Sequence, residues 1–281
     1  MDALDRLIDL ALDEDFGAAG DVTTLALIPP TARGRGELVA KERLVFAGAE
    51  AFARVFARLE ATASVTFRHG DGAHLDAGTA VATVSALVRT LLGGERVALN
   101  IIQRLCGIAT LAAQAQEAVR GTRCRVLDTR KTAPGMRALS KLAVRAGGAF
   151  NHRFGLSDGV LIKDNHLAAM GGDIRAALRR AREEAPRLVK IEIELTSVEQ
   201  LEDAVAGGAD VVLLDNMDDA QVAEAMRRMR GRVPVEVSGG VTLERLPKLA
   251  ALGVDFVSLG ALTHSARAMD LSLELVDAAA L

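Results

Sequence analysis

Residues 188–240 read LVKIEIELTSVEQLEDAVAGGADVVLLDNMDDAQVAEAMRRMRGRVPVEVSGG, and this stretch decides the fold. It holds three short apolar runs, at 188–193, 211–214 and 233–237, and each run carries or precedes charged residues, amides or glycines. The segments between the runs have the composition of amphipathic helices. One strand followed by one helix, repeated, is the pattern of βα units that close into a barrel or form a doubly wound sheet.

The same pattern extends to both sides of this stretch. Six apolar runs are marked by residues that lie 35, 29, 23, 23 and 22 positions apart, namely Asp128, Lys163, Glu192, Asp215, Ser238 and Gly260. The runs are nearly continuous in apolar residues, as expected of a parallel sheet that is covered on both faces. Because the carboxyl ends of such strands meet at one edge of the sheet, we expect the marked residues to face one cavity.

The region before these repeats has a different pattern of apolar and polar residues. Short alternating segments at 37–40 and 80–84 predict strands, and residues 2–12 and 49–59 have helical spacing. A long helical pattern follows Gly94. We therefore predict an α/β protein in which an N-terminal α+β sandwich domain, residues 1–104 joined by the C-terminal tail 267–281, packs on an incomplete (β/α) barrel of about six strands, residues 105–266.

Composition excludes several classes of function. Of 281 residues, half are hydrophobic, and the net charge is −3 with a pI near 6.0, so no basic footprint for nucleic acid is present. The chain has eight Phe and neither Trp nor Tyr, which leaves little for base stacking. The N-terminus is acidic and no apolar run is long enough to span a membrane. We expect a soluble, cytoplasmic protein with no nucleic-acid or membrane partner.

Cations gather at the ends of two predicted strands. Residues 128–135 read DTRKTAPG, residues 151–153 read NHR, and residues 163–166 read KDNH. Taken alone, a pair of cations at a strand end is often a solvated turn. Three such motifs in a chain with net negative charge instead favour a polyanionic substrate, and the nearby carboxylates favour a divalent metal.

These motifs resemble the quinolinate phosphoribosyltransferase family, also called nicotinate-nucleotide pyrophosphorylase (carboxylating). The resemblance runs nearly end to end, and the order and spacing of its motifs are specific. The departures are mild: Ala133 stands where Thr is frequent, and Ala146 where Cys is frequent. The matching stretches are residues 14–15, 20–24, 95–105, 128–135, 151–153, 161–166, 214–217, 236–241 and 260–265.

The resemblance implies an enzyme of NAD biosynthesis. Its reaction joins quinolinate to phosphoribosyl pyrophosphate and gives nicotinate mononucleotide, pyrophosphate and carbon dioxide. Planar carboxylates suit forked guanidinium donors, which agrees with the cationic motifs. The resemblance places the quinolinate ligands at Arg96, Arg130, His152, Arg153 and Lys163.

The resemblance also assigns the second substrate and the cofactor. Lys131 is expected to contact pyrophosphate, and Glu192 and Asp215 to hold Mg²⁺; with Lys163 these form the expected catalytic group. Backbone N–H groups of two glycine-rich turns are expected to bind the 5′-phosphate. A homodimer, or a higher even oligomer, with shared active sites is expected as well. The two turns comprise Ser238, Gly239 and Gly240, and Gly260 and Ala261.

Several alternatives stay open at this point. Lys163 is also compatible with a Schiff-base lysine, although its polar neighbours disfavour a low pKa. His152 and His166 lie on different loops without metal-ligand spacing. Glu194 and Glu236 point inward or outward according to strand register, so a structural ion pair is as compatible as a catalytic role. A molybdenum-locus paralogue and a catalytically silent pyridine-nucleotide sensor share the expected fold; the DTRKT and KDNH runs disfavour the first, and the carboxylates the second.

Overall fold

The computed structural model describes residues 2–278, which divide into two compact units. Of the described residues, unit 1 comprises 2–113, 132–148 and 265–278, and unit 2 comprises 114–131 and 149–264. The packing thus groups residues 105–113 and 132–148 with the N-terminal region, whereas the sequence analysis placed them with the barrel. The expected boundary between residues 104 and 105 falls inside one continuous helix, so no break in the backbone marks it.

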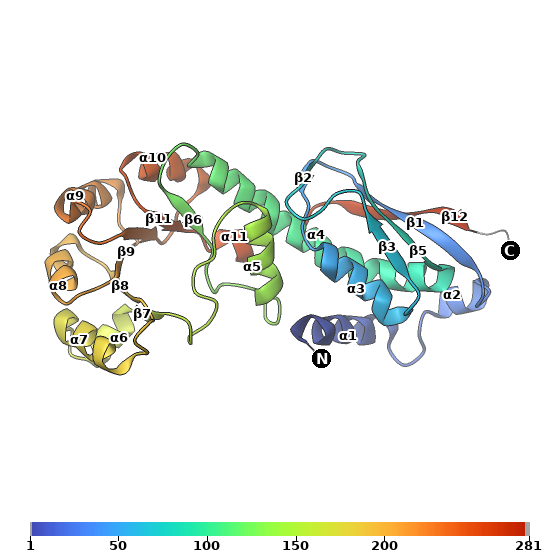
Figure 1. The fold of residues 1–281 in the computed structure, drawn as a ribbon, viewed down its shortest axis with the longest axis horizontal. Coiled ribbons are helices and arrows are strands. Elements are labelled where there is room, and N and C mark those ends of the chain that lie inside the picture. Colours follow the sequence, from blue (N-terminus) through green and yellow to red (C-terminus); the bar gives the residue numbers. More distant parts are fainter. Residues whose placement is uncertain (1, 279–281) are drawn as a thin grey trace. The chain divides into compact units, whose positions relative to one another are not determined.

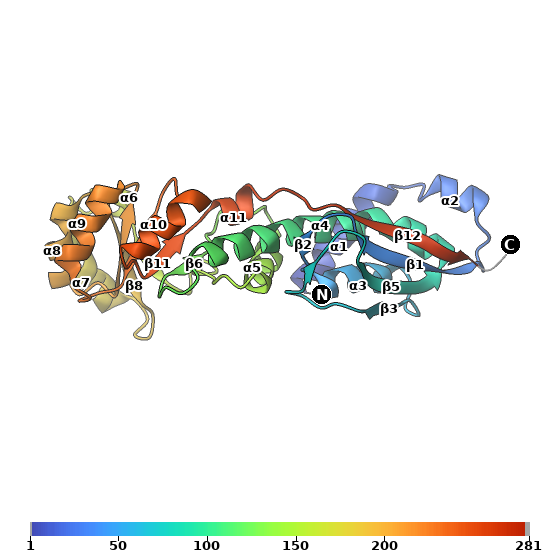
Figure 2. The same cartoon turned by 90° about the horizontal axis from the view of Figure 1, so that it is seen from above.

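Unit 1 is built on a four-stranded antiparallel sheet of order β12-β1-β5-β3, visible in Figures 1 and 2. Its strands are β1 (Arg33–Ala40), β3 (Ser64–Phe67), β5 (Ala80–Leu87) and β12 (Leu271–Ala278), and a small second sheet pairs β2 (Leu44–Val45) with β4 (His74–Leu75). The helices are α1 (Ala3–Phe16), α2 (Val22–Leu27), α3 (Ala49–Leu59), α4 (Val88–Ala118, whose last turn belongs to unit 2) and α5 (Arg137–Ala146).

The core of unit 1 follows from the period of its strands. Alternate residues of β1, including Leu38 and Ala40, are fully buried, as the two-residue period of a strand requires. Helix α3 contributes Phe52 and Phe56, whose rings meet edge to face at 5.1 Å. At the 25 cal/mol per Å² typical of apolar burial, each such ring contributes about 2–3 kcal/mol to the free energy of unfolding.

The C-terminal segment joins this sheet. It crosses α4 at Gly107, where a side-chain carbon would lie only 1.8 Å from the carbonyl oxygen of Arg267. Only glycine permits so close a crossing. Two hydrogen bonds hold it there: Met269 N–H donates to the Gln103 carbonyl at 2.9 Å, and the Gln103 side-chain amide donates to the Leu271 carbonyl at 3.0 Å. Strand β12 then pairs antiparallel with β1.

Unit 2 is a six-stranded, all-parallel sheet of order β6-β11-β10-β9-β8-β7. This confirms the predicted α/β class and the incomplete barrel of about six strands. Figure 1 shows helices α7 to α10 along the outer side of the strands. The strands are β6 (Arg125–Leu127), β7 (Val160–Ile162), β8 (Ile191–Leu195), β9 (Val211–Asp215), β10 (Val235–Ser238) and β11 (Phe256–Ser258). The helices are α6 (Asp164–Ala169), α7 (Ile174–Glu184), α8 (Leu201–Ala206), α9 (Asp219–Met229), α10 (Leu246–Ala251) and α11 (Ala261–His264), with 3-10 turns η1 (Val198–Gln200) and η2 (Leu243–Arg245).

The two faces of this sheet have opposite chemistry. Along β8, Ile193 and Leu195 are fully buried on one face, and Glu192 and Glu194 alternate with them on the other. Strand register aligns Glu194 with Leu213 of β9, which in turn pairs with Glu236 of β10. The IEIEL sequence therefore packs its aliphatic side chains together in the core and turns its carboxylates toward the barrel interior.

Candidate functional site

A pocket of about 840 Å³ lies at the carboxyl ends of the strands of unit 2. This is the position expected for the active site of a parallel (β/α) architecture. Every residue of its wall belongs to unit 2. The sequence-predicted members of the wall are Arg130, Lys131, His152, Arg153, Lys163, Asp215, Ser238, Gly239, Gly240, Gly260 and Ala261.

The pocket wall also contains residues to which the sequence analysis gave no role, or whose role it left open. Glu194 and Glu236 both reach the pocket, which settles the register question left by the sequence. Sequence reasoning missed four wall residues with amide or hydroxyl side chains, of which Asn216 adjoins a recognised aspartate in the LDN motif and was the easiest to detect. The Ser and Thr residues near strand ends are not part of a comparably recognisable motif. The four are Thr129, Asn216, Thr242 and Ser258.

The loop that follows β6 is tied to the loop before β7 by one buried carboxylate. Asp128 is fully buried and accepts hydrogen bonds from the His152 backbone N–H at 2.9 Å and from the Asn151 side-chain amide at 2.6 Å. The DTRK and NHR motifs are therefore one structural unit. Two cations of this unit, Arg130 and Arg153, lie close together: burial and then the charge of Arg130 lower the pKa of Arg153 below its usual range.

Lys163 is held at the first turn of α6. Its backbone N–H donates to Nδ1 of His166 at 2.9 Å, which explains why the KDNH motif has histidine three positions on. Its ammonium donates to Glu194 at 2.5 Å. This contact fixes the ammonium at the pocket wall. A fixed cation is suited to binding an anion, and it is the opposite of the apolar surroundings that a Schiff-base lysine needs.

The turns after β9 and β10 contact each other in the pocket wall. Asn216 adopts a left-handed backbone with φ 54°, and its amide donates to the Asp215 carboxylate at 2.7 Å. Its backbone N–H donates to the Ser238 carbonyl at 3.0 Å. The Asn216 side chain thereby fills the space above Gly239, where a side-chain carbon would lie 2.3 Å from its Oδ1 atom. Asp215 is oriented by this arrangement.

We expect Gly239→Ala to destabilise the fold more than Gly240→Ala. Both glycines have positive φ, 86° and 57°, so alanine adds strain of about 1–3 kcal/mol at either site. Only at Gly239 does it also clash with Asn216, whereas Gly240 has open space. Overpacking typically costs about 1–3 kcal/mol more. Urea denaturation of both variants measures the difference, and equal free energies of unfolding would contradict this account of the turn.

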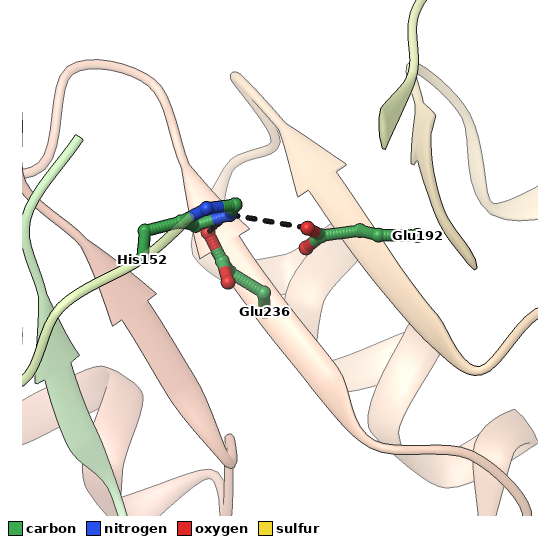
Figure 3. A group of neighbouring side chains, drawn as sticks. All are labelled: His152, Glu192 and Glu236. Carbon is green, nitrogen blue, oxygen red and sulfur yellow. Dashed lines mark ion pairs between the residues drawn. The ribbon is translucent and has the colours of Figure 1, made fainter. Parts of the chain in front are cut away.

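Deeper in the barrel, His152 meets two buried glutamates (Figure 3). Its Nε2 atom lies 3.1 Å from Glu192 Oε2 and 3.7 Å from Glu236 Oε1, and Figure 3 shows these side chains pointing toward one another from β8, β10 and the loop before β7. The Arg153 backbone N–H donates to His152 Nδ1 at 2.7 Å, so the proton of the neutral ring sits on Nε2, facing the carboxylates.

The electrostatics of this group follow from burial. Burial, followed by the charge of Glu192, raises the pKa of Glu236 to about 8. Burial alone lowers the pKa of His152, but its hydrogen bond to Glu192 and the charge of Glu236 outweigh burial, so that pKa is raised. At neutral pH the group therefore retains protons that isolated carboxyls release.

Two predicted site residues lie outside the pocket wall. Glu192 is buried below it in contact with His152. Arg96 lies on α4, on an exposed part of unit 1. The structure thus brings together eleven of the predicted site residues in one wall, and Arg96 requires a separate explanation.

Comparisons with known proteins identify the family. Family models described as "Quinolinate phosphoribosyl transferase, N-terminal domain" and "C-terminal domain" match residues 21–106 and 108–274. The chain is 42% identical over 272 residues to a probable nicotinate-nucleotide pyrophosphorylase [carboxylating] of Bacillus subtilis, covering 97% of this chain and 93% of the relative. It is 43% identical to the nicotinate-nucleotide pyrophosphorylase [carboxylating] of Mycobacterium leprae, covering 98% of each.

Solved structures give the same result. The crystal structure of NadC from Streptococcus pyogenes superposes with a TM-score of 0.92 at 40% sequence identity, covering 96% of this chain and 95% of that one. The nicotinate-nucleotide pyrophosphorylase from Francisella tularensis superposes with a TM-score of 0.90 at 34% identity, covering 97% and 96%.

Proposed function

The chain belongs to the quinolinate phosphoribosyl transferase family, and from that premise we propose that the pocket of unit 2 is where its reaction takes place. The enzyme is a phosphoribosyltransferase that converts quinolinate and phosphoribosyl pyrophosphate to nicotinate mononucleotide in NAD biosynthesis. Pyrophosphate and carbon dioxide are the other products. Both substrates are polyanions, so the charges of the pocket wall decide how each is held.

One observation carries the placement of quinolinate: three cations and His152 belong to the wall of a single pocket. Arg130 and Arg153 lie close enough to repel each other, and Lys163 is held by Glu194. Such mutual repulsion is tolerable when a dianion neutralises the group. Two adjacent carboxylates on a planar ring match paired guanidinium donors.

The remaining wall suits phosphoribosyl pyrophosphate. The two glycine-rich turns offer backbone N–H groups to a phosphate, at the position after the last strands where such barrels bind phosphate. Gly260 allows Lys131 and His264 to approach, since a side-chain carbon there would lie 3.0 Å from Lys131 Cδ and 3.1 Å from His264 Nε2. Lys131 is further fixed because its carbonyl accepts the Thr263 hydroxyl at 2.8 Å. We place pyrophosphate beside Lys131.

The donor set fits Mg²⁺, which prefers a few carboxylates plus substrate oxygens. Asp215 and Glu194 both belong to the pocket wall, and Asn216 orients Asp215. The sequence paired Asp215 with Glu192. Glu192 contacts His152 and Glu194 pairs with Lys163, so both glutamates are candidates to hold Mg²⁺ together with Asp215. When bound, Mg²⁺ supplies positive charge to the diphosphate.

Catalysis then rests on charge stabilisation. The pyridine nitrogen of quinolinate attacks the anomeric carbon, and the bond to pyrophosphate breaks. We assign Lys131 to the charge that develops on the leaving pyrophosphate, and the carboxylates of the wall to the positive charge that develops on the sugar. Preorganised charges in a partly enclosed site typically supply the largest share of such rate enhancement.

Pyrophosphate release tests the reaction and the metal assignment together. Release should require quinolinate, phosphoribosyl pyrophosphate and Mg²⁺ at once. Asp215→Asn should lower turnover and raise the Mg²⁺ concentration for half-maximal rate about tenfold or more, with quinolinate affinity nearly unchanged. Of Glu192→Gln and Glu194→Gln, the variant that raises the Mg²⁺ requirement identifies the second carboxylate. Asp203→Asn, which alters an exposed ion pair with Arg175, is the matched control.

The outcomes separate the candidates. A raised Mg²⁺ requirement in Glu192→Gln, with Glu194→Gln unaffected, would return the metal to Glu192. Wild-type turnover at limiting Mg²⁺ in all three carboxylate variants would assign the metal to substrate oxygens alone. Release of pyrophosphate without quinolinate would contradict the placement of the reaction.

Arg96 leads to a proposal about assembly. It is exposed on α4, while the pocket wall is formed by unit 2 alone. We propose a homodimer, or a higher even oligomer, in which a second copy supplies Arg96 to the pocket. Exposed apolar side chains on α1, α2 and α4 offer surface for such an interface: Leu10, Val22, Leu25, Leu27 and Leu92. An obligate interface of this kind buries roughly 2,000 Å² or more.

A cytoplasmic location without membrane or nucleic-acid partners remains part of the proposal. One helix, α4, is long and apolar enough to cross a membrane, but 61% of its most apolar window is buried inside the structure, as in the core helix of a globular unit. The curated relatives include bacterial proteins and plant proteins named as chloroplastic or mitochondrial.

A further inference from the structure

A buried carboxylate joins the two loops that carry cations of the pocket. Asp128 is fully buried, and its two oxygens accept hydrogen bonds from different residues. Oδ1 accepts from the His152 backbone N–H at 2.9 Å, and Oδ2 accepts from the Asn151 side-chain amide at 2.6 Å. Asp128 is not part of the pocket wall, so it can act on a substrate only through its neighbours.

The side chain of Asp128 continues a backbone ladder. The Phe150 N–H donates to the Val126 carbonyl at 2.9 Å, and the Asp128 N–H donates to the Phe150 carbonyl at 3.0 Å, as in a parallel strand pair. In a regular ladder the next N–H, that of His152, would donate to the backbone carbonyl of residue 128. It donates to the Asp128 side chain instead. The backbone after Asp128 can therefore leave the ladder while His152 stays attached.

Three groups of the pocket wall depend on this junction. Arg130 follows Asp128 by two positions, His152 is bonded to Asp128, and Arg153 comes next in the chain. The Arg153 backbone N–H donates to His152 Nδ1 at 2.7 Å, and its guanidinium donates to the Gly159 carbonyl at 2.9 Å. A displacement of the His152 backbone therefore moves the imidazole and the Arg153 guanidinium together.

We propose that Asp128 is a positioning residue that sets the affinity for quinolinate, with Asn151 as its hydrogen-bond partner. The inference rests on the proposed function, which places quinolinate beside Arg130, His152 and Arg153. Without the carboxylate, the loops that carry these three side chains lose their common attachment, and the donors that quinolinate needs are no longer held in one arrangement.

The rest of the wall is attached to other parts of unit 2. The Lys131 carbonyl accepts the Thr263 hydroxyl at 2.8 Å, and the Asn216 amide donates to the Asp215 carboxylate at 2.7 Å. Loss of the Asp128 junction should therefore raise the KM for quinolinate and leave the KM for phosphoribosyl pyrophosphate nearly unchanged. A merely structural role would change both constants alike or neither.

An exchange of the two side chains tests the positioning role. Asp128→Ala removes both acceptors and Asn151→Asp brings two carboxylates together, so each should weaken quinolinate binding about tenfold or more in calorimetry. In the double variant Asp128→Asn/Asn151→Asp, the new amide can donate to the new carboxylate and still accept from the His152 N–H. Affinity should return to within about threefold of the wild type, because one amide–carboxylate bond replaces another.

Asp71→Ala is the matched control. Asp71 accepts the Gly48 and Ala49 backbone N–H groups at 2.9 Å and 3.0 Å in unit 1, and it is not part of the pocket wall. Its loss removes a carboxylate with two donors, as Asp128→Ala does. Urea denaturation should show a lower free energy of unfolding, whereas quinolinate affinity should stay unchanged.

The outcomes separate this inference from the proposed function. If wild-type protein binds quinolinate, unchanged affinity in folded Asn151→Asp, or no recovery in the double variant, overturns the positioning role alone. Asn151 is exposed, so its variant remains informative if Asp128→Ala fails to fold. Wild-type protein that does not bind quinolinate would overturn the proposed function, and this inference with it.

Discussion

Arg130→Ala should weaken quinolinate binding about 30-fold or more while leaving the fold intact. The guanidinium lies in the pocket wall beside Arg153, on the loop that Asp128 fixes. Removing one partner of a buried, hydrogen-bonded charge pair typically costs about 2–5 kcal/mol. Each 1.4 kcal/mol is tenfold in affinity, so the lower limit already gives roughly 30-fold. Calorimetry with quinolinate measures the effect.

The control for this experiment is Arg175→Ala. Arg175 forms an exposed ion pair with Asp203, and such pairs contribute at most about 1 kcal/mol to stability. Its loss should leave quinolinate affinity unchanged. If Arg130→Ala binds quinolinate as tightly as the control does, the cationic side of the pocket has another purpose, and quinolinate must be placed elsewhere.

Mixing two inactive variants should restore activity if Arg96 acts in the pocket of a second copy. Arg96→Ala and Lys163→Ala are each expected to be nearly inactive. After dissociation and reassociation, a heterodimer contains one pocket with both substitutions and one with neither. Random pairing makes half of the dimers mixed, so about a quarter of all pockets regain activity in a twofold dimer. Pyrophosphate release from the mixture, compared with each parent, gives the result.

Exchange of subunits needs its own check. Mass spectrometry of differently labelled variants shows whether mixed dimers form, and a mixture of Lys131→Ala with Lys163→Ala is the matched control. Lys131 and Lys163 both belong to the same pocket wall, so every pocket in that mixture keeps one substitution. Restored activity in the control, or its absence in the test mixture despite confirmed exchange, would contradict a shared pocket.

Much of the fold could be predicted from local patterns. A continuous apolar run that is followed by Asp215 and Asn216 predicts the strand at 211–215. The alternation of apolar and acidic residues in IEIEL predicts β8. Helix α9 begins with the capping box of Asp218 and Gln221, which the structure shows with both reciprocal hydrogen bonds. The residues that make up each signal lie within a few positions of one another. Each signal can therefore be recognised without knowledge of the tertiary contacts.

Other features needed the assembled barrel. The sequence alone does not decide whether the side chains of Glu194 and Glu236 point into or out of the barrel. A shift of one residue in register reverses the face on which every side chain of a strand lies. The observed pairing of Glu194 and Glu236 with Leu213 fixes both inward. The grouping of 132–148 with unit 1 was hidden for a related reason: contacts between segments far apart in sequence leave no local pattern.

The sequence by itself determined the class of fold, the family resemblance and the cations that face the pocket, because strand runs, caps and the DTRKT, NHR and KDNH motifs are local. Only the tertiary structure decided how those parts combine. Lys163 is paired with Glu194, Asp215 is oriented by Asn216, and His152 meets two glutamates from separate strands. Partners so distant in the chain are chosen by sheet order and register, and those depend on packing the whole core at once.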